Sequence, residues 1–194
     1  MIFLIQMELM LNKWRKYMIV ICEGLDRVGK STQIQRIKRY YEEKNRLFHI
    51  LHYSNIKGPN IEERSKIYYK EMFELIKYAH DKINLILDRA HIGEVVYSPL
   101  YRNYSGEYVF GLEKLYEPYL YNTRLLVFID RAENLITRDD GLSFTAQLNK
   151  KTDEIERFTE AYNKSFLRKA LINIDGYDEE AVWNNFVKKA LEEL

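Results

Sequence analysis

The segment from residue 24 to residue 31 constrains the fold most, because it reads G-L-D-R-V-G-K-S and so has the spacing G-x-x-x-x-G-K-S. The two glycines let the backbone curl until several N–H groups face one point, and the positive end of a following helix strengthens the attraction for an anion there. An apolar run, Met18–Cys22, precedes the segment, and Ile34, Ile37 and Tyr41 follow it on one helical face. A strand, a glycine-rich loop and a helix in this order predict a phosphate-binding loop, the P-loop of nucleoside triphosphate-binding proteins.

The rest of the chain alternates between apolar runs of strand length and segments of helical periodicity. The predicted strands cover residues 18–22, 46–52, 83–87, 124–129 and 171–174. The predicted helices cover residues 30–44, 61–80, 112–121 and 150–167, with two more starting at 132 and 179, and residues 90–111 are unassigned. Strands that alternate with helices favour right-handed crossovers and one parallel sheet. We therefore expect an α/β P-loop NTPase fold, with a five-stranded parallel sheet flanked by helices and a short lid.

Composition favours one domain with an ordinary core. The 194 residues carry a net charge of only +1, which argues against non-specific coating of nucleic acid, because such binding requires many cations. Cys22 is the only cysteine, so no internal disulfide can form and we expect a cytoplasmic location. Residues 1–11 are apolar but too short to span a bilayer, and no cleavage site follows. We interpret residues 1–17 as an N-terminal extension and residues 18–194 as the domain, with no membrane association.

Four charged or polar positions have chemistry that suits phosphates. Lys30 can reach the β- and γ-phosphates of a nucleotide, and the Ser31 hydroxyl can bind Mg²⁺. Asp88 directly follows the predicted strand 83–87, and ligands of parallel sheets bind beyond the carboxyl ends of the strands. Its carboxylate can organise the Mg²⁺ shell or accept a proton, while the adjacent Arg89 can bind a phosphate through two N–H groups. A plain ion pair at the end of a strand is the alternative interpretation of Asp88 and Arg89.

The segment Glu23–Thr32 closely resembles the phosphate loop of thymidylate kinases, in particular of those with an Asp-Arg pair inside the loop. Leu87–Arg89 matches the position of the Asp-Arg-Tyr motif of that family, and Glu156-x-Phe158 is similar to its Glu-Phe segment after the lid. The resemblance covers most of the chain from Met18 onward. It implies that Arg27 leans over the γ-phosphate as an arginine finger, and that Asp26 turns toward a sugar hydroxyl of the acceptor.

The acceptor side departs from the family pattern. The family has Tyr after the Asp-Arg pair, then Ser and Tyr-Gln, whereas residues 90–97 here read A-H-I-G-E-V-V-Y; residues 52–55 read H-Y-S-N in place of Phe-Pro-x-Arg. These segments resemble those of phage-encoded members. Glu94 and Tyr97 would share a helix face near Arg89, where Tyr97 either contacts a sugar or base or is a half-buried core residue. We expect His91 at the surface.

Arg138 follows the predicted strand 124–129 and a short helix. Kinases of this class place an arginine at this point, at the entrance to the lid. Arg138 either stacks on adenine or reaches the transferring phosphate, or it is a solvated arginine beside Asp139 and Asp140. The predicted catalytic residues are Lys30, Arg27, Asp88 and Arg89. The predicted cofactor-binding residues are Gly24, Arg27, Val28, Gly29, Lys30, Ser31, Thr32 and Arg138. The predicted substrate-binding residues are Asp26, Arg89, Glu94 and Tyr97, and the metal-binding residues are Ser31 and Asp88.

The leading hypothesis is a kinase that uses ATP and Mg²⁺ to phosphorylate a deoxynucleoside monophosphate, most simply dTMP to dTDP. Two alternatives stay open: a kinase acting on a deoxynucleoside or on a modified base in DNA, and a nucleotide-binding ATPase or switch module. A guanine switch would need an Asn-Lys-x-Asp segment, and Asn149–Asp153 has one residue too many. The expected partner is a small nucleotide, nucleic acid is expected only under the first alternative, and a homodimer stays open.

Overall fold

Five parallel strands form the centre of the structure, a computed structural model that describes residues 17–193 except 54–55, 57, 139–144 and 146. The strands are β1 (Ile19–Gly24), β2 (Phe48–His52), β3 (Asn84–Asp88), β4 (Thr123–Ile129) and β5 (Arg168–Asn173), in the order β2-β3-β1-β4-β5. Every neighbouring pair is parallel. All of β1 is buried, as expected for a strand covered on both faces, which explains why the strand segments are apolar runs without alternation.

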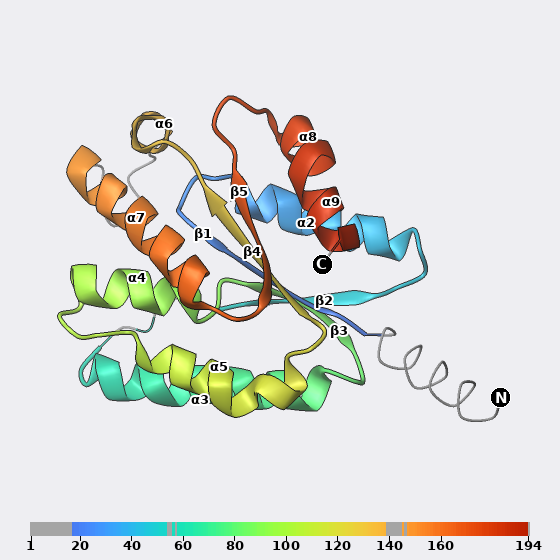
Figure 1. Ribbon diagram of the computed structural model, residues 1–194, viewed down its shortest axis with the longest axis horizontal. Helices are drawn as coiled ribbons and strands as arrows, with labels where there is room; N and C mark the ends of the chain where they lie inside the picture. The colour runs from blue at the N-terminus through green and yellow to red at the C-terminus, as the bar shows by residue number, and fades with distance from the viewer. Residues whose placement is uncertain (1–16, 54–55, 57, 139–144, 146, 194) are drawn as a thin grey trace.

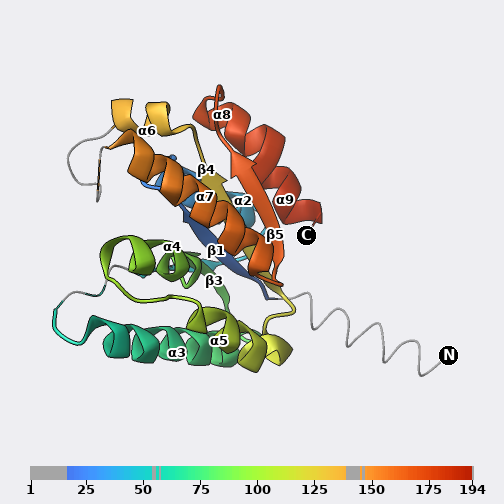
Figure 2. The ribbon, with the colours of Figure 1, turned by 60° about the vertical axis from the view of Figure 1, so that its left-hand side comes forward.

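Helices cover both faces of the sheet (Figures 1 and 2). One face is covered by α2 (Lys30–Glu42) and by the C-terminal α8 (Glu179–Val182), η2 (Trp183–Val187) and α9 (Lys188–Glu193). The other face is covered by α3 (Ile61–Ala79), α4 (Ile92–Tyr101), α5 (Tyr108–Tyr116) and α7 (Leu148–Lys164). Two short elements, η1 (Glu117–Tyr119) and α6 (Ala132–Thr137), flank β4 in the sequence. The prediction of a five-stranded parallel sheet flanked by helices is confirmed.

The hydrophobic core lies on both sides of the sheet. Ile34 and Ile37 of α2 are buried on one side, and Phe73 of α3 and Phe158 of α7 are fully buried on the other. Burial of a side chain of this size contributes about 1.5–3 kcal/mol. The core therefore fixes the helices on both faces, and with them the loops that connect strand ends to helices.

Strand β1 lies where the order of the strands reverses. It pairs with β3 on one side and with β4 on the other, so the next strand in the sequence, β2, lies at the edge beyond β3. Ligands of open parallel sheets bind beyond the carboxyl ends of the strands at such a switch point. Residues 25–29 connect the carboxyl end of β1 to α2 (Figure 1). The topology therefore brings the glycine-rich segment to that point.

The elements differ from the sequence prediction mainly between residues 90 and 121. The unassigned stretch contains α4 and the start of α5. Residues 92–98 of α4 are all buried, so this helix lacks the polar stripe that periodicity detects. The helix predicted over 112–121 ends at Tyr116, because Pro118 lies in η1 and cannot continue α-helical hydrogen bonding. Farther on, the helix predicted over 150–167 ends at Lys164, and β5 begins at Arg168 rather than at 171.

In the described part of the chain, no helix is long and apolar enough to cross a membrane. The predicted extension over residues 1–17 and the short lid after Arg138 fall almost entirely outside the described residues. The division of the chain at residue 17 and the lid therefore stay predictions.

Candidate active site at the carboxyl ends of β1 and β3

The loop after β1 has the conformation that its glycines permit. Gly24 has φ +132°, and a Cβ there would overlap the carbonyl oxygen of Phe128 on β4. The next residue, Leu25, donates its N–H to that same oxygen at 3.3 Å. Gly29 has φ +67° and immediately precedes α2. The first glycine thus allows close approach of two strands, and the second allows the turn that aims the N-terminus of α2 at the loop.

Lys30 begins α2 and its side chain is buried among charged groups. Burial lowers the pKa of the Lys30 ammonium, and the charge of Arg89 lowers it further. Asp88, Glu23 and Asp26 oppose this shift, because their carboxylates favour the charged form. Two cations and three carboxylates therefore act on one another around the loop. An anion bound beside Lys30 would relieve the repulsion between Lys30 and Arg89.

Asp88 and His52 lie opposite each other at the carboxyl ends of β3 and β2. Nδ1 of His52 is 2.9 Å from Oδ2 of Asp88. The second carboxylate oxygen, Oδ1, is buried and has no hydrogen-bond partner among the described residues. Leaving a buried polar atom unpaired costs about 1–3 kcal/mol. Oδ1 of Asp88 is therefore suited to a ligand at the end of the strand.

A magnesium ion fits this set of groups. Mg²⁺ is usually held by one or two protein oxygens together with waters and nucleotide phosphates, rather than by a protein cage. Among the described residues, no group of three or more His, Cys, Asp or Glu is arranged to hold a metal ion. Ser31, exposed in the first turn of α2, and the open oxygen of Asp88 are the residues that would hold the ion. Its chemistry would be the neutralisation of charge on the phosphates.

Asp26, in the loop, and Arg89, directly after β3, form an ion pair across the end of the sheet. Burial raises the pKa of the Asp26 carboxyl, but the charge and hydrogen bond of Arg89, together with the charges of Lys30 and Lys151, outweigh burial, so that the pKa is lowered overall. Arg89 and Arg27 have positive φ, 67° and 69°. This backbone conformation is unfavourable for residues other than glycine and is concentrated at functional sites. Two such arginines beside one ion pair make the region a candidate functional site.

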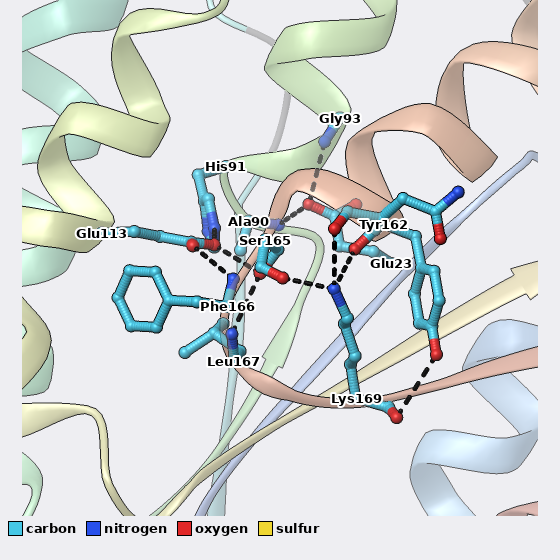
Figure 3. Close-up of polar contacts among 11 residues, drawn as sticks. Glu23, Ala90, His91, Gly93, Glu113, Tyr162, Ser165, Phe166, Leu167 and Lys169 are labelled. Carbon is cyan, nitrogen blue, oxygen red and sulfur yellow. Dashed lines mark hydrogen bonds and ion pairs between the residues drawn. The ribbon is translucent and has the colours of Figure 1, made fainter.

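A buried network supports the turn between β3 and α4 from behind (Figure 3). Oε1 of Glu23, on β1, accepts hydrogen bonds from the N–H groups of Ala90 at 2.8 Å and Gly93 at 3.1 Å. The next side chain, His91, has no exposed surface and contacts Glu113 of α5 at 2.6 Å. Ser165 donates to the same carboxylate at 2.7 Å. The expectation that His91 lies at the surface is wrong, because Glu113 and Ser165 provide it with a buried polar environment.

Glu94 and Tyr97 lie on α4 within the protein interior. The Glu94 carboxylate accepts hydrogen bonds from Arg102 at 2.7 Å, Tyr104 at 2.6 Å and Tyr108 at 3.0 Å, and the residue is 1% exposed. Tyr97 is also buried, with its ring edge-on to Phe158 at 5.8 Å, and burial raises the pKa of its hydroxyl well above the usual value. Both residues lie near Arg89 in the sequence, and their substrate contacts stay predictions.

A cavity of about 310 Å³ lies on the α2 side of the loop. Its walls are formed by Arg27, Val28, Gly29, Gln33, Arg138, Ile174, Tyr177, Asp178, Glu179 and Val182. The guanidinium of Arg138 is held by the buried Asp130, 2.7 Å from its Oδ2. The segment after β5, Ile174–Glu179, was not predicted to contribute. The glycine at position 176 is the sequence signal that could have marked this segment as a loop at a strand end, and in the structure it has φ +77°.

The structure thus separates the predicted residues into two groups. Arg27, Val28, Gly29 and Arg138 line the cavity, and α2 is hydrogen-bonded to Glu179, another lining residue. Thr32 donates its hydroxyl hydrogen to Glu179 at 3.1 Å, and Gln33 donates to the Glu179 carbonyl at 2.9 Å. Asp26, Asp88 and Arg89 lie instead at the carboxyl ends of β1 and β3 and do not line this cavity.

No protein-family model matches the chain, and no curated protein matches it. Among solved structures, the chain is similar to the YorR protein of Bacillus subtilis, whose crystal structure is a complex with phosphorylated GDP. The TM-score is 0.60 at 15% identity, and the match covers 80% of this chain and 85% of that chain. With the parallel sheet and the loop geometry, this similarity confirms the predicted α/β P-loop NTPase fold.

Proposed function

We propose that the chain is a Mg²⁺-dependent kinase that transfers the γ-phosphoryl group of ATP to a deoxynucleoside monophosphate, with dTMP, converted to dTDP, as the leading acceptor. The observation that carries the proposal is the pair of features beside the phosphate loop. One is a cavity lined by Arg27, Val28 and Gly29 of the loop, and the other is the set of side-chain contacts that join Asp26 to Arg89 and Asp88 to His52. Phosphoryl transfer requires mainly positioning and neutralisation of charge, which suits these groups.

The donor nucleotide is assigned to the loop and its cavity. Backbone N–H groups of the loop and the N-terminus of α2 suit the phosphates, and Lys30 suits the β- and γ-phosphates. The base is assigned to the cavity, whose lining includes Arg138 and Tyr177, because a planar guanidinium can stack on an aromatic ring. The phosphorylated GDP in the similar YorR structure supports a nucleotide ligand for this fold.

The acceptor is assigned to the ends of β1 and β3. Arg89 can bind the acceptor phosphate through two N–H groups, and Asp26 can accept a hydrogen bond from a sugar hydroxyl. Because the two side chains are paired with each other, binding of the acceptor replaces one ion pair by two substrate contacts. The resemblance of the loop to that of thymidylate kinases supports dTMP.

A kinase that phosphorylates a hydroxyl group, on a deoxynucleoside or on a modified base in DNA, is the second candidate. Asp88 favours it, because a carboxylate with an open oxygen at the strand end can accept the proton of an attacking hydroxyl. The Glu94 carboxylate also accepts hydrogen bonds from three side chains of the protein itself. These bonds favour the second candidate, because they leave Glu94 no role in binding a monophosphate acceptor.

The experiment is an ADP-release assay with ATP, Mg²⁺ and one acceptor at a time. The acceptors are the deoxynucleoside monophosphates, the deoxynucleosides, and duplex DNA with and without hydroxymethylated pyrimidines. Mass spectrometry identifies the phosphorylated product. We expect the fastest ADP release with dTMP, and dTDP as the product.

Other outcomes select among the alternatives. Preferential phosphorylation of a deoxynucleoside or of DNA supports the second candidate. ADP release at one rate with or without any acceptor supports an ATPase or switch module. Absence of ADP release under all conditions contradicts the proposal.

A further inference from the structure

His52 is the last residue of β2, and it lies beside the open carboxylate of the candidate site without being part of the phosphate loop or of the β3 motif. The register of the parallel strands places it opposite Asp88. Its side chain is 56% exposed, whereas that of Asp88 is 15% exposed. The backbone carbonyl of Asp88 also accepts a hydrogen bond from the N–H of Tyr53 at 2.9 Å. β2 and the residue that follows it therefore hold Asp88 at two atoms, one in the backbone and one in the side chain.

The contact is asymmetric, and the asymmetry is informative. Nδ1 of His52 contacts only Oδ2 of Asp88, and Oδ1 is left buried without a donor among the described residues. An arginine at the same position would tend to bind both oxygens, because its N–H groups match a carboxylate in a two-point geometry. A histidine fixes one oxygen and leaves the other for a ligand.

Stabilisation of the fold is a weak explanation for this pair. Exposed ion pairs contribute only about 0–1 kcal/mol, and the imidazole is more than half exposed. The buried, unpaired Oδ1 is a cost that a structural contact would avoid, since natural structures pair nearly all buried polar atoms. By contrast, carboxylates that bind metal ions are commonly held by a hydrogen bond from a neighbouring residue, which fixes their orientation.

We propose that His52 is a positioning residue. It donates from Nδ1 to Oδ2 of Asp88 and so keeps Oδ1 directed toward the site, where it receives the magnesium ion of the bound nucleotide or a water of its shell. This inference rests on the proposed function, because that function supplies the ion. It adds a residue from the edge strand β2 to a site otherwise formed by β1 and β3.

The experiment compares four single variants, and the double variant that combines His52→Ala with Asp88→Asn, with the parent chain. His52→Ala removes the donor, and His52→Asn keeps an amide N–H near the position of Nδ1. Asp88→Asn removes the charge that His52 orients. His49→Ala is the matched control, because His49 is an exposed histidine earlier on the same strand. For each variant we measure kcat, KM for ATP and, by electron paramagnetic resonance, the affinity for Mn²⁺ in the complex with a non-hydrolysable ATP analogue.

We expect His52→Ala to lower the Mn²⁺ affinity and kcat by about tenfold, within the range of about 10–100-fold seen when a residue that orients a metal ligand is removed. KM for ATP should change little. His52→Asn should recover most of both losses, and His49→Ala should match the parent. In the Asp88→Asn background, His52→Ala should have no further effect, because the group it orients is gone.

The Mn²⁺ measurement needs no acceptor, so it separates this inference from the proposed function. If the parent phosphorylates no acceptor but His52→Ala and Asp88→Asn both weaken Mn²⁺ binding, the inference holds and the proposed function fails. If Asp88→Asn weakens Mn²⁺ binding and His52→Ala does not, the inference is overturned while the proposed function stands. The inference is also overturned if His52→Ala and Asp88→Asn both keep the parental Mn²⁺ affinity. It is overturned as well if His52→Asn binds Mn²⁺ no better than His52→Ala.

Discussion

The proposed donor half of the candidate site, which is the phosphate loop with the first turn of α2, is built mostly from backbone, whereas the proposed acceptor half is built from side chains that meet across distant segments. The donor half uses two glycine turns, the loop after β1 and the first turn of α2, all within residues 24–32. The acceptor half joins Asp26 to Arg89, 63 residues apart, and His52 to Asp88, 36 residues apart.

This difference between backbone and side-chain contacts decides which residue changes each half of the site tolerates. Backbone N–H groups are the same for every residue type, so the donor half depends on a few glycines and one lysine. Side-chain pairs depend on both partners, so a change on β2 or α4 alters the acceptor half without disturbing the loop.

The largest expected effect tests the donor half. Lys30→Met removes a charge that is needed most in the transition state, and turnover should fall by a factor on the order of 10² or more. Because burial lowers the pKa of the Lys30 ammonium, the folded state tolerates this charge poorly, and the melting temperature of the variant should equal or exceed that of the parent. Steady-state kinetics and thermal unfolding check both statements.

The control for that variant is Lys38→Met, at a lysine farther along α2 that pairs with Glu42 at 3.6 Å. It should have parental turnover. Turnover of Lys30→Met within threefold of the parent would contradict the assignment of the phosphate loop.

The prediction with the next largest effect tests whether the side chain of Arg27 acts on the phosphoryl group that is transferred. Arginine fingers contribute about 10³-fold or more in rate, and Arg27→Lys keeps the charge but loses the two-point geometry. We expect turnover to fall by about tenfold or more, with KM for the acceptor nearly unchanged. The matched control is Arg36→Lys, farther along α2, where Arg36 pairs with Glu180 of α8 at 2.5 Å. An increase in acceptor KM with unchanged turnover would move Arg27 to the acceptor half.

The contrast between the halves also explains what could be predicted from the sequence. The motif at residues 24–31 has fixed spacing between an apolar run and a helix, so the loop, the sheet and the positions of Lys30 and Asp88 were predictable. The partners in the acceptor half were not, because spacing says nothing about which side chains meet. Strand order brings His52 to Asp88, and packing of α5 against the β3–α4 turn gives His91 its partner Glu113. Helix α4 was missed for a related reason, since a helix buried on all sides has no amphipathic pattern.

A smaller effect tests the acceptor half. Asp26→Ala removes a carboxylate proposed to accept a hydrogen bond from a sugar hydroxyl. KM for dTMP should rise by about tenfold, the effect of losing a charged hydrogen bond of about 1.5 kcal/mol. KM for its 3′-deoxy analogue, which lacks the hydroxyl, should change much less, and KM for ATP should stay constant. Asp81→Ala, in the turn before β3, is the control. Equal losses for both acceptors would contradict the separate roles of Asp26 and Arg27.

The smallest expected effect concerns stability in acid, and it tests whether the Asp26–Arg89 pair is also part of what holds the ends of β1 and β3 together. The folded pKa of Asp26 is lowered, because the charge and hydrogen bond of Arg89, together with the charges of Lys30 and Lys151, outweigh burial, whereas an unfolded Asp has a pKa of about 3.9. A group whose pKa is lower in the folded state contributes stability that is fully present above the unfolded pKa. That stability is lost as the pH falls through the folded pKa.

The measurement is the melting temperature of the parent and of Asp26→Asn between neutral pH and about pH 2.5. Near neutral pH the parent should melt higher by about 2–4 °C, the shift expected for about 1 kcal/mol in a chain of this length. The difference should shrink below about pH 4, because the parent then loses the charge that the variant never had. Glu113, whose pKa His91 also lowers against the effect of burial, titrates in both proteins, so its contribution cancels in the comparison. A constant difference in melting temperature across the whole pH range would mean that Asp26 stabilises the loop by its shape rather than by its charge.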